Sequence, residues 1–194
     1  MAAAANNIRY KLEVEIEVKC SGDMFYCMFK QNVMELPKYL PHLYEGVEII
    51  EGDGISVGTV KLWKYVLHGG GRCLNGKERM TFVDDEKRMI THSIFEGEVM
   101  NDYKCLDIKL AVTPKDECGD GDGDGDGDGD GGADGSMVKW CLEYEKANED
   151  SPSAIAYLDF VERVTKDLNT YLLNHHHQAD HHQLLIKDGV TKHN

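Results

Sequence analysis

The stretch SPSAIAYLDFVERVTKDLNTYLL, Ser151 to Leu173, is the longest helical pattern in the chain. Its apolar side chains recur every three or four residues, which is the spacing of one face of an α-helix. Ser151 is a good N-cap and Pro152 suits the first helical position, so we expect the helix to begin there. The apolar face consists of Ile155, Leu158, Val161, Val164, Leu168, Tyr171 and Leu172.

No other segment offers a comparable helix that would cover this apolar face. Residues 9–19 alternate between apolar and charged side chains, which is the pattern of a half-buried strand. A short helix capped by Ser21 and a broken helix over 36–43 come next. Six further strands are expected at 47–50, 59–67, 77–83, 88–96, 104–112 and 137–146.

These elements predict an α+β fold in which the long helix lies on the concave face of one curved antiparallel sheet. If the sheet and the helix do not meet fully, the gap between them is a pocket. We therefore look for function in that gap.

Length, composition and charge limit the class of protein. The 194 residues fit one domain, and no apolar run approaches the about 20 residues of a membrane span. The N-terminus lacks a signal-peptide pattern and the six cysteines form no CxxC pair, so we expect a cytoplasmic protein with reduced thiols. The net charge of −14 argues against nucleic acid and against anionic membranes as partners.

A Gly-Asp repeat separates two of the predicted strands. It cannot bury apolar surface, so we predict a disordered insertion over 119–135 in a hairpin loop. Asp120, Asp122 and Asp124 match the start of an EF-hand loop, but the twelfth position is Gly131 instead of the bidentate glutamate. The repeat is therefore not expected to be a calcium site.

The two ends of the chain are also expected to lie outside the packed fold. Residues 1–7 are predicted to be flexible, and 175–194 a disordered His-rich tail. Histidines of such a tail take up metal ions only adventitiously. The sequence thus predicts one domain over 8–174 with no cofactor and no metal site.

Three features are candidates for a binding site. The loop with Gly52, Gly54 and Gly58 lacks the ending of a P-loop, so a connection between adjacent strands is favoured over a phosphate cradle. His92 shares the presumed inner face of its strand with Ile90 and Ile94, where a satisfied core histidine is the usual explanation. The strand 59–67 is ambiguous, because one face carries Lys61, Trp63 and Tyr65 and the other carries Val60, Leu62 and Val66.

Several strings resemble the major latex protein and ripening-related group of the birch pollen allergen (Bet v I) superfamily. They are LPKYLPHLYEGVEIIEGDG, GTVKLWKY, IFEGEVMNDYK, MVKWCLEYEK and YLDFVERVTKDLNTYLL, and the match covers about residues 8–173. The resemblance implies a helix-grip (START-like) fold. In this fold a seven-stranded curved antiparallel sheet and two short helices enclose the long C-terminal helix around a large internal apolar cavity.

The resemblance also implies which residues line the cavity, and it favours the Lys61 face of the ambiguous strand. Related proteins usually carry a polar aromatic residue at the position of His92, so ligand preference here is expected to differ. The implied wall consists of Lys61, Trp63, Tyr65, Ile90, His92, Ile94, Leu106, Ile108, Leu110, Trp140, Tyr157, Phe160, Val161 and Val164.

No complete catalytic set is visible in the sequence. Some relatives are reported as ribonucleases that use a lysine, two glutamates and a tyrosine. Here Lys61 and Tyr171 would match, but Asn169 and Asp102 stand where the glutamates would be. Without both acids, general acid-base cleavage lacks its parts. We therefore expect a non-enzymatic protein.

The sequence leads to one principal hypothesis and two alternatives. The principal one is a plant defence or stress-related binding protein, monomeric, that holds a sterol, a fatty acid or a hormone in its cavity. One alternative is an enzyme of the same fold that uses Lys61, His92 or Tyr65 as acid-base groups. The other is a metal-binding protein that acts through the Gly-Asp and His tracts.

Overall fold

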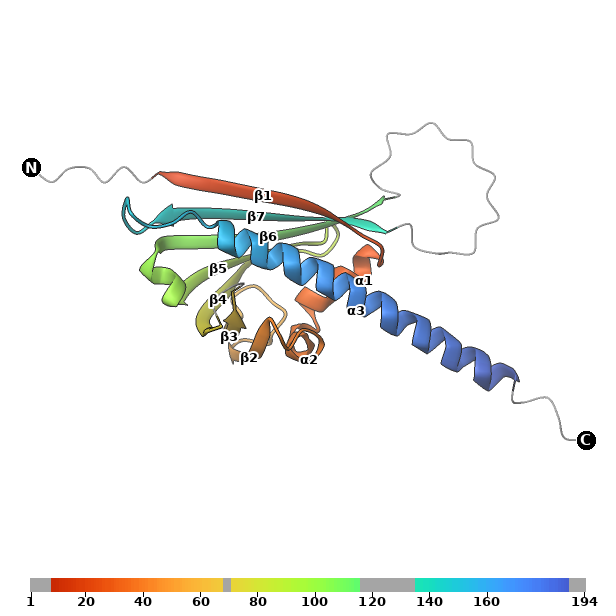
Figure 1. Cartoon of the computed structure of the whole chain (residues 1–194). Coiled ribbons are helices and arrows are strands. Elements are labelled where there is room, and N and C mark those ends of the chain that lie inside the picture. The colour runs from red at the N-terminus through yellow and green to blue at the C-terminus, as the bar shows by residue number, and fades with distance from the viewer. Residues whose placement is uncertain (1–7, 68–70, 116–134, 189–194) are drawn as a thin grey trace, which may run out of the picture.

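The computed structural model describes residues 8–67, 71–115 and 135–188, with side chains described as far as His175. Its elements follow the predicted order of strand, short helices, six strands and long helix (Figure 1). The structure does not describe residues 1–7, His68 or most of the Gly-Asp insertion. The disorder predicted for residues 1–7 and for the insertion therefore stays a prediction.

Seven strands form one antiparallel sheet in the order β1-β7-β6-β5-β4-β3-β2. The predicted seven-stranded antiparallel sheet is confirmed, although β2 and β4 begin earlier than the sequence indicated. The strands are β1 (Arg9–Val18), β2 (Tyr44–Glu51), β3 (Val60–Val66), β4 (Cys73–Asp84), β5 (Met89–Gly97), β6 (Tyr103–Pro114) and β7 (Ser136–Lys146).

Alternating side chains give the sheet an apolar inner face and a charged outer face. Val138, Trp140, Leu142 and Tyr144 of β7 are all buried on the inner side. On the outer side, Lys139 reaches two glutamates of the neighbouring strand β1 at 3.4 and 3.0 Å. Exposed pairs of this kind contribute little because water and salt screen them, so the apolar inner face dominates the stability of the sheet.

The two edge strands, β1 and β2, differ in the feature that makes pairing with another strand unfavourable. Strand β1 exposes Lys11 and the glutamates at 13, 15 and 17 along its outer face. Strand β2 is interrupted twice, by register shifts next to Tyr44 and next to Ile49. Both edges therefore depart from a flat, uncharged strand.

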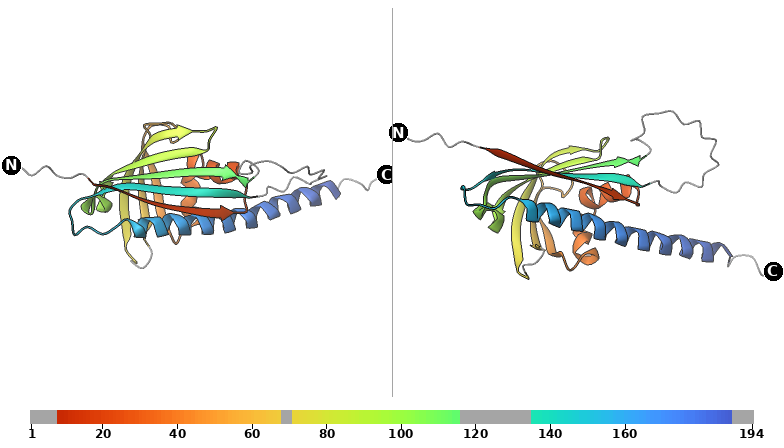
Figure 2. Two further views of the ribbon diagram at one scale, coloured as in Figure 1. Left: turned by 90° about the horizontal axis from the view of Figure 1, so that it is seen from above. Right: turned by 45° about the horizontal axis from the view of Figure 1, so that its top comes forward.

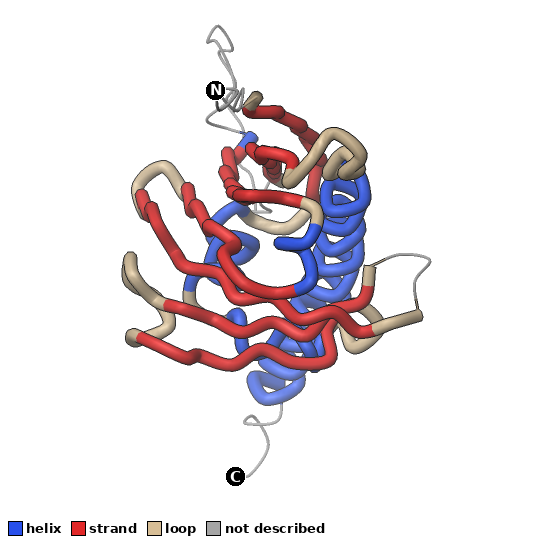
Figure 3. Tube along the Cα trace, turned by 90° about the vertical axis from the view of Figure 1, so that its left-hand side faces the viewer, coloured by secondary structure: helices blue, strands red, loops and turns tan. Residues whose placement is uncertain are grey.

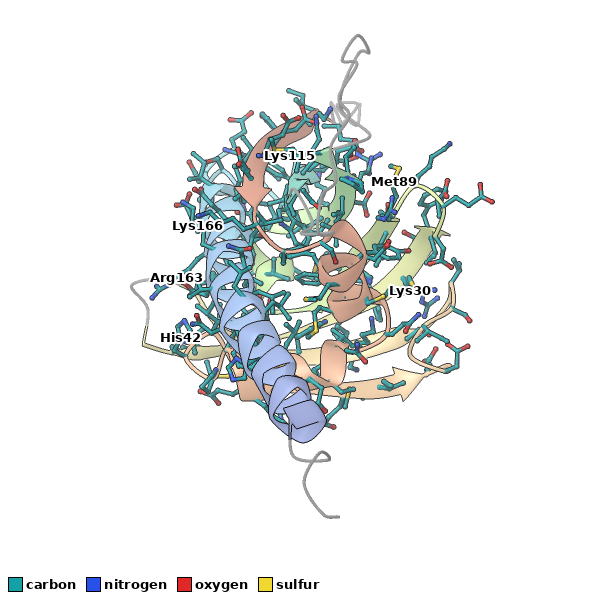
Figure 4. All side chains as sticks on the ribbon, turned by 90° about the vertical axis from the view of Figure 1, so that its right-hand side faces the viewer. Lys30, His42, Met89, Lys115, Arg163 and Lys166 are labelled. Atoms are coloured by element: carbon teal, nitrogen blue, oxygen red, sulfur yellow. The ribbon has the colours of Figure 1, made fainter. Side chains whose placement is uncertain are left out.

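Short helices close one end of the sheet, as the sequence predicted. Ser21 caps α1 (Gly22–Lys30) by accepting the N–H of Met24, and a turn of 3₁₀-helix (Val33–Glu35) leads into α2 (Leu36–Tyr39). The hydroxyl of Tyr26 donates to Asp85 at 2.7 Å, which ties α1 to the turn between β4 and β5. Lys30 of α1 lies on the opposite side of the molecule from His42 (Figure 4).

Helix α3 (Ile155–Asp188) runs along the concave side of the sheet, beside β1 (Figure 2). Its buried apolar positions are Phe160, Val161, Val164, Leu168 and Leu172. All but Phe160 belong to the predicted apolar face, and the predicted Leu158 and Tyr171 are half-buried. Ile155 does not belong to that face, because it stands in the first turn and is 52% exposed.

Both ends of α3 differ from the prediction. Ser151 is not the N-cap, because its hydroxyl accepts the N–H of Asn148 in a preceding turn, and the helix begins four residues later. At the other end, α3 extends to Asp188, past residue 175 where the sequence predicted a disordered tail. The helix continues through the histidines because no Gly or Pro interrupts the chain before Gly189.

One buried hydrogen bond fastens α3 to the sheet. The indole N–H of Trp140 donates to the hydroxyl of Thr165 at 2.8 Å, and this hydroxyl donates to the Val161 carbonyl at 2.8 Å. Thr165 has no exposed surface. The contact therefore fixes the position of the helix along β7.

Replacing Thr165 with valine keeps the shape of the side chain but leaves the Trp140 N–H buried without an acceptor. We expect Thr165→Val to lower the free energy of unfolding by about 1–3 kcal/mol in urea denaturation. Thr170→Val is the matched control, because Thr170 makes the same bond to the carbonyl four residues earlier but is exposed. Equal losses in the two variants would contradict the role given to the Trp140–Thr165 bond.

Candidate ligand-binding cavity

A cavity of about 90 Å³ lies between the inner face of the sheet and α3. Among the strands, α3 packs most closely against β1 and β7, whereas the sheet curves around the helix (Figure 3). Space is therefore left over the middle strands. This volume is several times the 10–15 Å³ that one water occupies, but it is below the roughly 300–1,000 Å³ of sites for drug-sized ligands.

The cavity is smaller than the large cavity that the family resemblance implied. The reason is the size of the side chains that point into it. Aromatic rings approach one another across the space, with centroids 5.4 Å apart for Tyr44 and Phe160 and 5.6 Å apart for Tyr65 and Phe160. Such rings fill most of the room that a curved sheet would otherwise enclose.

Most of the predicted wall residues do face the cavity. They come from four strands and the first turns of α3. They are Trp63, Tyr65, His92, Ile94, Leu106, Ile108, Trp140, Tyr157, Phe160 and Val161.

Four predicted wall residues do not line the cavity. Ile90 and Leu110 pair across β5 and β6 at the end of the sheet near α1, and they belong to the packed core. Val164 is buried in the core further along α3. Lys61 is buried beside the cavity without forming its wall. Alternation identifies the inward face of a strand but not where along the strand the cavity ends.

Several wall residues were not predicted to line the cavity. Phe29 and Val33 belong to the short helices, and nothing in the sequence indicated which residues of these helices reach the cavity. Glu78 was overlooked because a charged residue in a strand is normally assigned to the solvent side. The complete set of unpredicted wall residues is Phe29, Val33, Tyr44, Gly76, Glu78 and Val99.

A buried group of ionisable side chains stands at the cavity on three adjacent strands. Lys61 of β3 pairs in register with Glu78 of β4, and His92 of β5 lies diagonally opposite Glu78. The Lys61 Nζ lies 4.0 Å from the Glu78 Oε1, and the His92 Nε2 lies 3.7 Å from the same oxygen. The exposed fractions of Lys61 and Glu78 are only 1% and 7%. We call Lys61, Glu78 and His92 the buried polar cluster.

Burial governs the charge of this cluster. Loss of contact with water lowers the pKa of Lys61 and the pKa of His92, because it disfavours the charged form of each group. The nearby carboxylate of Glu78 works in the opposite direction on both pKa values, but to a smaller extent. His92 is therefore held as a neutral imidazole at neutral pH.

A second polar contact in the cavity, a pair of tyrosine hydroxyls, lies further along β3. The hydroxyls of Tyr65 and Tyr157 hydrogen-bond to each other, and burial raises the pKa of each phenol. Trp140 also faces the cavity, but its N–H is already bonded to Thr165. The cavity is thus an aromatic space with Glu78 and His92 on one part of its wall and Lys61 buried beside them.

Comparison with known proteins agrees with this architecture. The sequence pattern of the pathogenesis-related protein Bet v 1 family matches residues 7–120 and 129–175.

This chain belongs to the Bet v 1 family.

Within the family it is similar to the major latex proteins. Major latex protein 22 of Papaver somniferum is 44% identical over 162 residues, which cover 84% of this chain and 89% of that protein. The crystal structure of major latex-like protein 151 from Panax ginseng has a TM-score of 0.70 at 26% identity and covers 84% of this chain and 97% of that one. Norcoclaurine synthase of Thalictrum flavum, at 21% identity and a TM-score of 0.61 over 90% of this chain and 95% of that one, shares the fold alone.

The glycine loop of this Bet v 1 chain joins the adjacent strands β2 and β3, as the preferred interpretation of the sequence held. Gly52, Gly54 and Gly58 all have positive φ, and none of them lines the cavity. The side chain of Asp53 accepts hydrogen bonds from the hydroxyl of Ser56 and from the N–H groups of Ile55 and Ser56. These bonds hold the pKa of the Asp53 carboxyl far below its usual range. The carboxylate of Asp53, which is part of the loop, thus accepts the N–H groups that a bound phosphate would need.

The residues compared with the ribonucleases of the family do not come together as a catalytic set. The Asn169 side chain accepts the N–H groups of Lys19 and Cys20, so it holds the turn after β1. Tyr171 stacks on Tyr39, with ring centroids 4.1 Å apart. Lys61 instead contacts Glu78.

The described part of the chain also lacks two other kinds of feature. No group of three or more His, Cys, Asp or Glu side chains there is placed to hold a metal ion. No described helix is both long enough and apolar enough to cross a membrane. The cysteines at 20, 27, 73, 105 and 141 are free thiols, and Cys118 lies outside the described residues.

The neutral state of His92 predicts a pH dependence of stability. The pKa of His92 is lower in the folded protein than the 6.5 of a free imidazole. Between these two pKa values the unfolded chain binds more protons, so the free energy of unfolding falls as the pH drops below 6.5. We expect His92→Asn to reduce this loss, measured by urea denaturation at about pH 7 and about pH 5.

His42→Asn is the control for this measurement, because His42 is exposed on the surface and pairs with Asp167 at 2.8 Å. It should retain the loss of stability at low pH. If His92→Asn follows the same pH dependence as the unchanged protein, His92 is not held neutral by burial.

Proposed function

We propose that this protein binds a hydrophobic small molecule in the cavity between α3 and the sheet, within the cytoplasm of a plant cell, as part of a defence or stress response. The observation that carries the proposal is the aromatic, largely apolar wall of the cavity, built mainly from the sheet and α3. Membership of the Bet v 1 family supports a ligand-binding fold. A sterol, a fatty acid or a hormone is the class of ligand that the family resemblance implies.

The size of the cavity limits how such a ligand binds. With about 90 Å³ available, one ring or a short chain fits, and a larger molecule must project outward or displace aromatic side chains. A ring that buries about 150 Å² of apolar surface gains about 4 kcal/mol, which corresponds to a Kd of about 1 mM. Tighter binding therefore requires polar contacts in addition to apolar burial.

An enzyme of the same fold is the second candidate, and one observation favours it. Lys61 and His92 both approach Glu78, so groups that could transfer protons are gathered at an apolar cavity. Tyr65 is not part of the buried polar cluster, because its hydroxyl forms a hydrogen bond with Tyr157. Substitution of Lys61 or His92 would abolish turnover in an enzyme, whereas it would only shift affinity in a binding protein.

Metal binding through the Gly-Asp and His tracts concerns side chains that, apart from His175, lie outside the described residues. Deletion of residues 119–132 and of everything after Asn174 would remove metal uptake if the tracts carried it.

Native mass spectrometry of the protein isolated from its own tissue tests the proposed function directly. We expect a co-purified apolar molecule of one mass, released on unfolding. A protein that carries no ligand, and that also fails to bind added apolar compounds, would contradict the proposal.

Filling the cavity should weaken binding. Ile94 faces the cavity, whereas its neighbour Phe95 is 43% exposed on the other face of β5. We expect Ile94→Trp to lower the affinity for the fluorescent apolar probe N-phenyl-1-naphthylamine by at least about tenfold, since the added ring takes the space of the probe.

Phe95→Trp is the matched control, because it places the same indole one residue away and outside the cavity. Its affinity for the probe should equal that of the unchanged protein. A similar loss in both variants would mean that the probe does not bind between β5 and α3.

A further inference from the structure

The buried polar cluster is incomplete in its hydrogen bonding. The Lys61 Nζ, the Glu78 Oε1, the His92 Nε2 and the nearby Trp63 Nε1 are all buried, and none has a hydrogen-bond partner within the described part of the protein. A buried polar group without a partner costs about 1–3 kcal/mol, and more if it is charged. Four such atoms at one cavity indicate a place that is shaped for a polar group of a ligand.

The distances within the cluster leave room for one bridging atom. The Glu78 Oε1 is 4.0 Å from the Lys61 Nζ and 3.7 Å from the His92 Nε2, and both separations exceed a hydrogen bond. An oxygen atom about 2.8 Å from the Glu78 Oε1 and from either nitrogen would bridge that pair without moving the strands. Glu78, His92 and Trp63 form part of the cavity wall, so a group inside the cavity reaches them.

The chemical types of the four atoms restrict what the bridging group is. Lys61 and Trp63 are donors that need an acceptor, whereas an ionised Glu78 needs a donor. The neutral imidazole of His92 serves as either, depending on its tautomer. A hydroxyl donates one hydrogen bond and accepts two, so it serves the Glu78 oxygen and two of the donors at once. An ether oxygen or a carboxylate only accepts and leaves the Glu78 oxygen without a partner.

The balance of charge points in the same direction. Lys61 and Glu78 together carry no net charge whichever of the two holds the shared proton, and His92 is neutral. A carboxylate or phosphate placed there would add a second negative charge beside the buried carboxylate of Glu78, where the low dielectric strengthens repulsion. A neutral hydroxyl leaves the balance unchanged.

We propose that Lys61, Trp63, Glu78 and His92 form a subsite that binds the hydroxyl group of an otherwise apolar ligand and discriminates against anionic head groups. This inference rests on the proposed binding function and narrows it. Of the ligand classes implied by the family resemblance, the subsite favours alcohols and phenols and disfavours ionised fatty acids.

The two tryptophans offer a direct test, because the chain contains no others. The indole N–H of Trp140 is already bonded to Thr165, whereas that of Trp63 has no acceptor. In ¹⁵N-labelled full-length protein, saturation with 1-octanol should move the Trp63 indole N–H resonance downfield and leave that of Trp140 nearly in place. Trp63→Phe assigns the two signals. Equal movement of both signals, or movement of neither, would overturn the subsite.

Affinity measurements with matched ligands give the second test. Heptyl methyl ether is an isomer of 1-octanol without the hydroxyl, and octanoate replaces the hydroxyl by a charge. In titrations of the unchanged protein, 1-octanol should bind at least about tenfold more tightly than heptyl methyl ether and than octanoate. In Glu78→Gln, the preference for 1-octanol over octanoate should fall by at least about tenfold, because the charge of Lys61 is no longer balanced.

Glu96→Gln is the matched control variant. Glu96 lies on the outer face of β5 and pairs with Lys77 at 2.8 Å, so its loss should leave every affinity unchanged. Circular dichroism confirms that each variant is folded. Equal binding of the three ligands, or a Glu78→Gln variant with the original preference, overturns the subsite and leaves the proposed binding function standing. Binding of none of the three overturns both.

Discussion

The apolar face of α3 has to be buried, and within the described structure the concave face of the sheet is what buries it. This constraint determines where the other elements lie. The helix rests against β1 and β7 and is fastened there by the bond between Trp140 and Thr165. The sheet continues through five more strands that curve past the helix. The cavity is therefore a direct result of covering one straight helix with a wide, twisted sheet.

The sequence predicted the faces of the elements better than their ends. Alternation placed Ile90 and Ile94 on the inner side, because a strand with one buried face has no freedom to turn over. It could not decide the face of Lys61, since both sides of that strand carry apolar residues. Ser151 looked like an N-cap, but its hydroxyl closes a preceding turn instead. Capping signals are short, and a competing local hydrogen bond is enough to redirect them.

The sequence predicted most of the apolar residues of the candidate site, but it did not predict the polar residue Glu78. Ile94 and Leu106 follow from periodicity, because apolar side chains at alternate positions are expected inside. Glu78 follows from no such rule, and its role depends on its pairing with Lys61 across two strands. Only the register of the strands brings these two residues together with His92. Information of that kind is long-range, and a single sequence does not display it.

The edges of the sheet have a consequence for behaviour at high concentration. An open sheet offers unpaired backbone N–H and C=O groups to any passing strand, which is the first step toward fibrous aggregates. Here the charged outer face of β1 and the two irregularities of β2 make such pairing unfavourable at both borders. Both borders of the sheet, β1 and β2, are therefore protected against pairing with the sheet of another molecule.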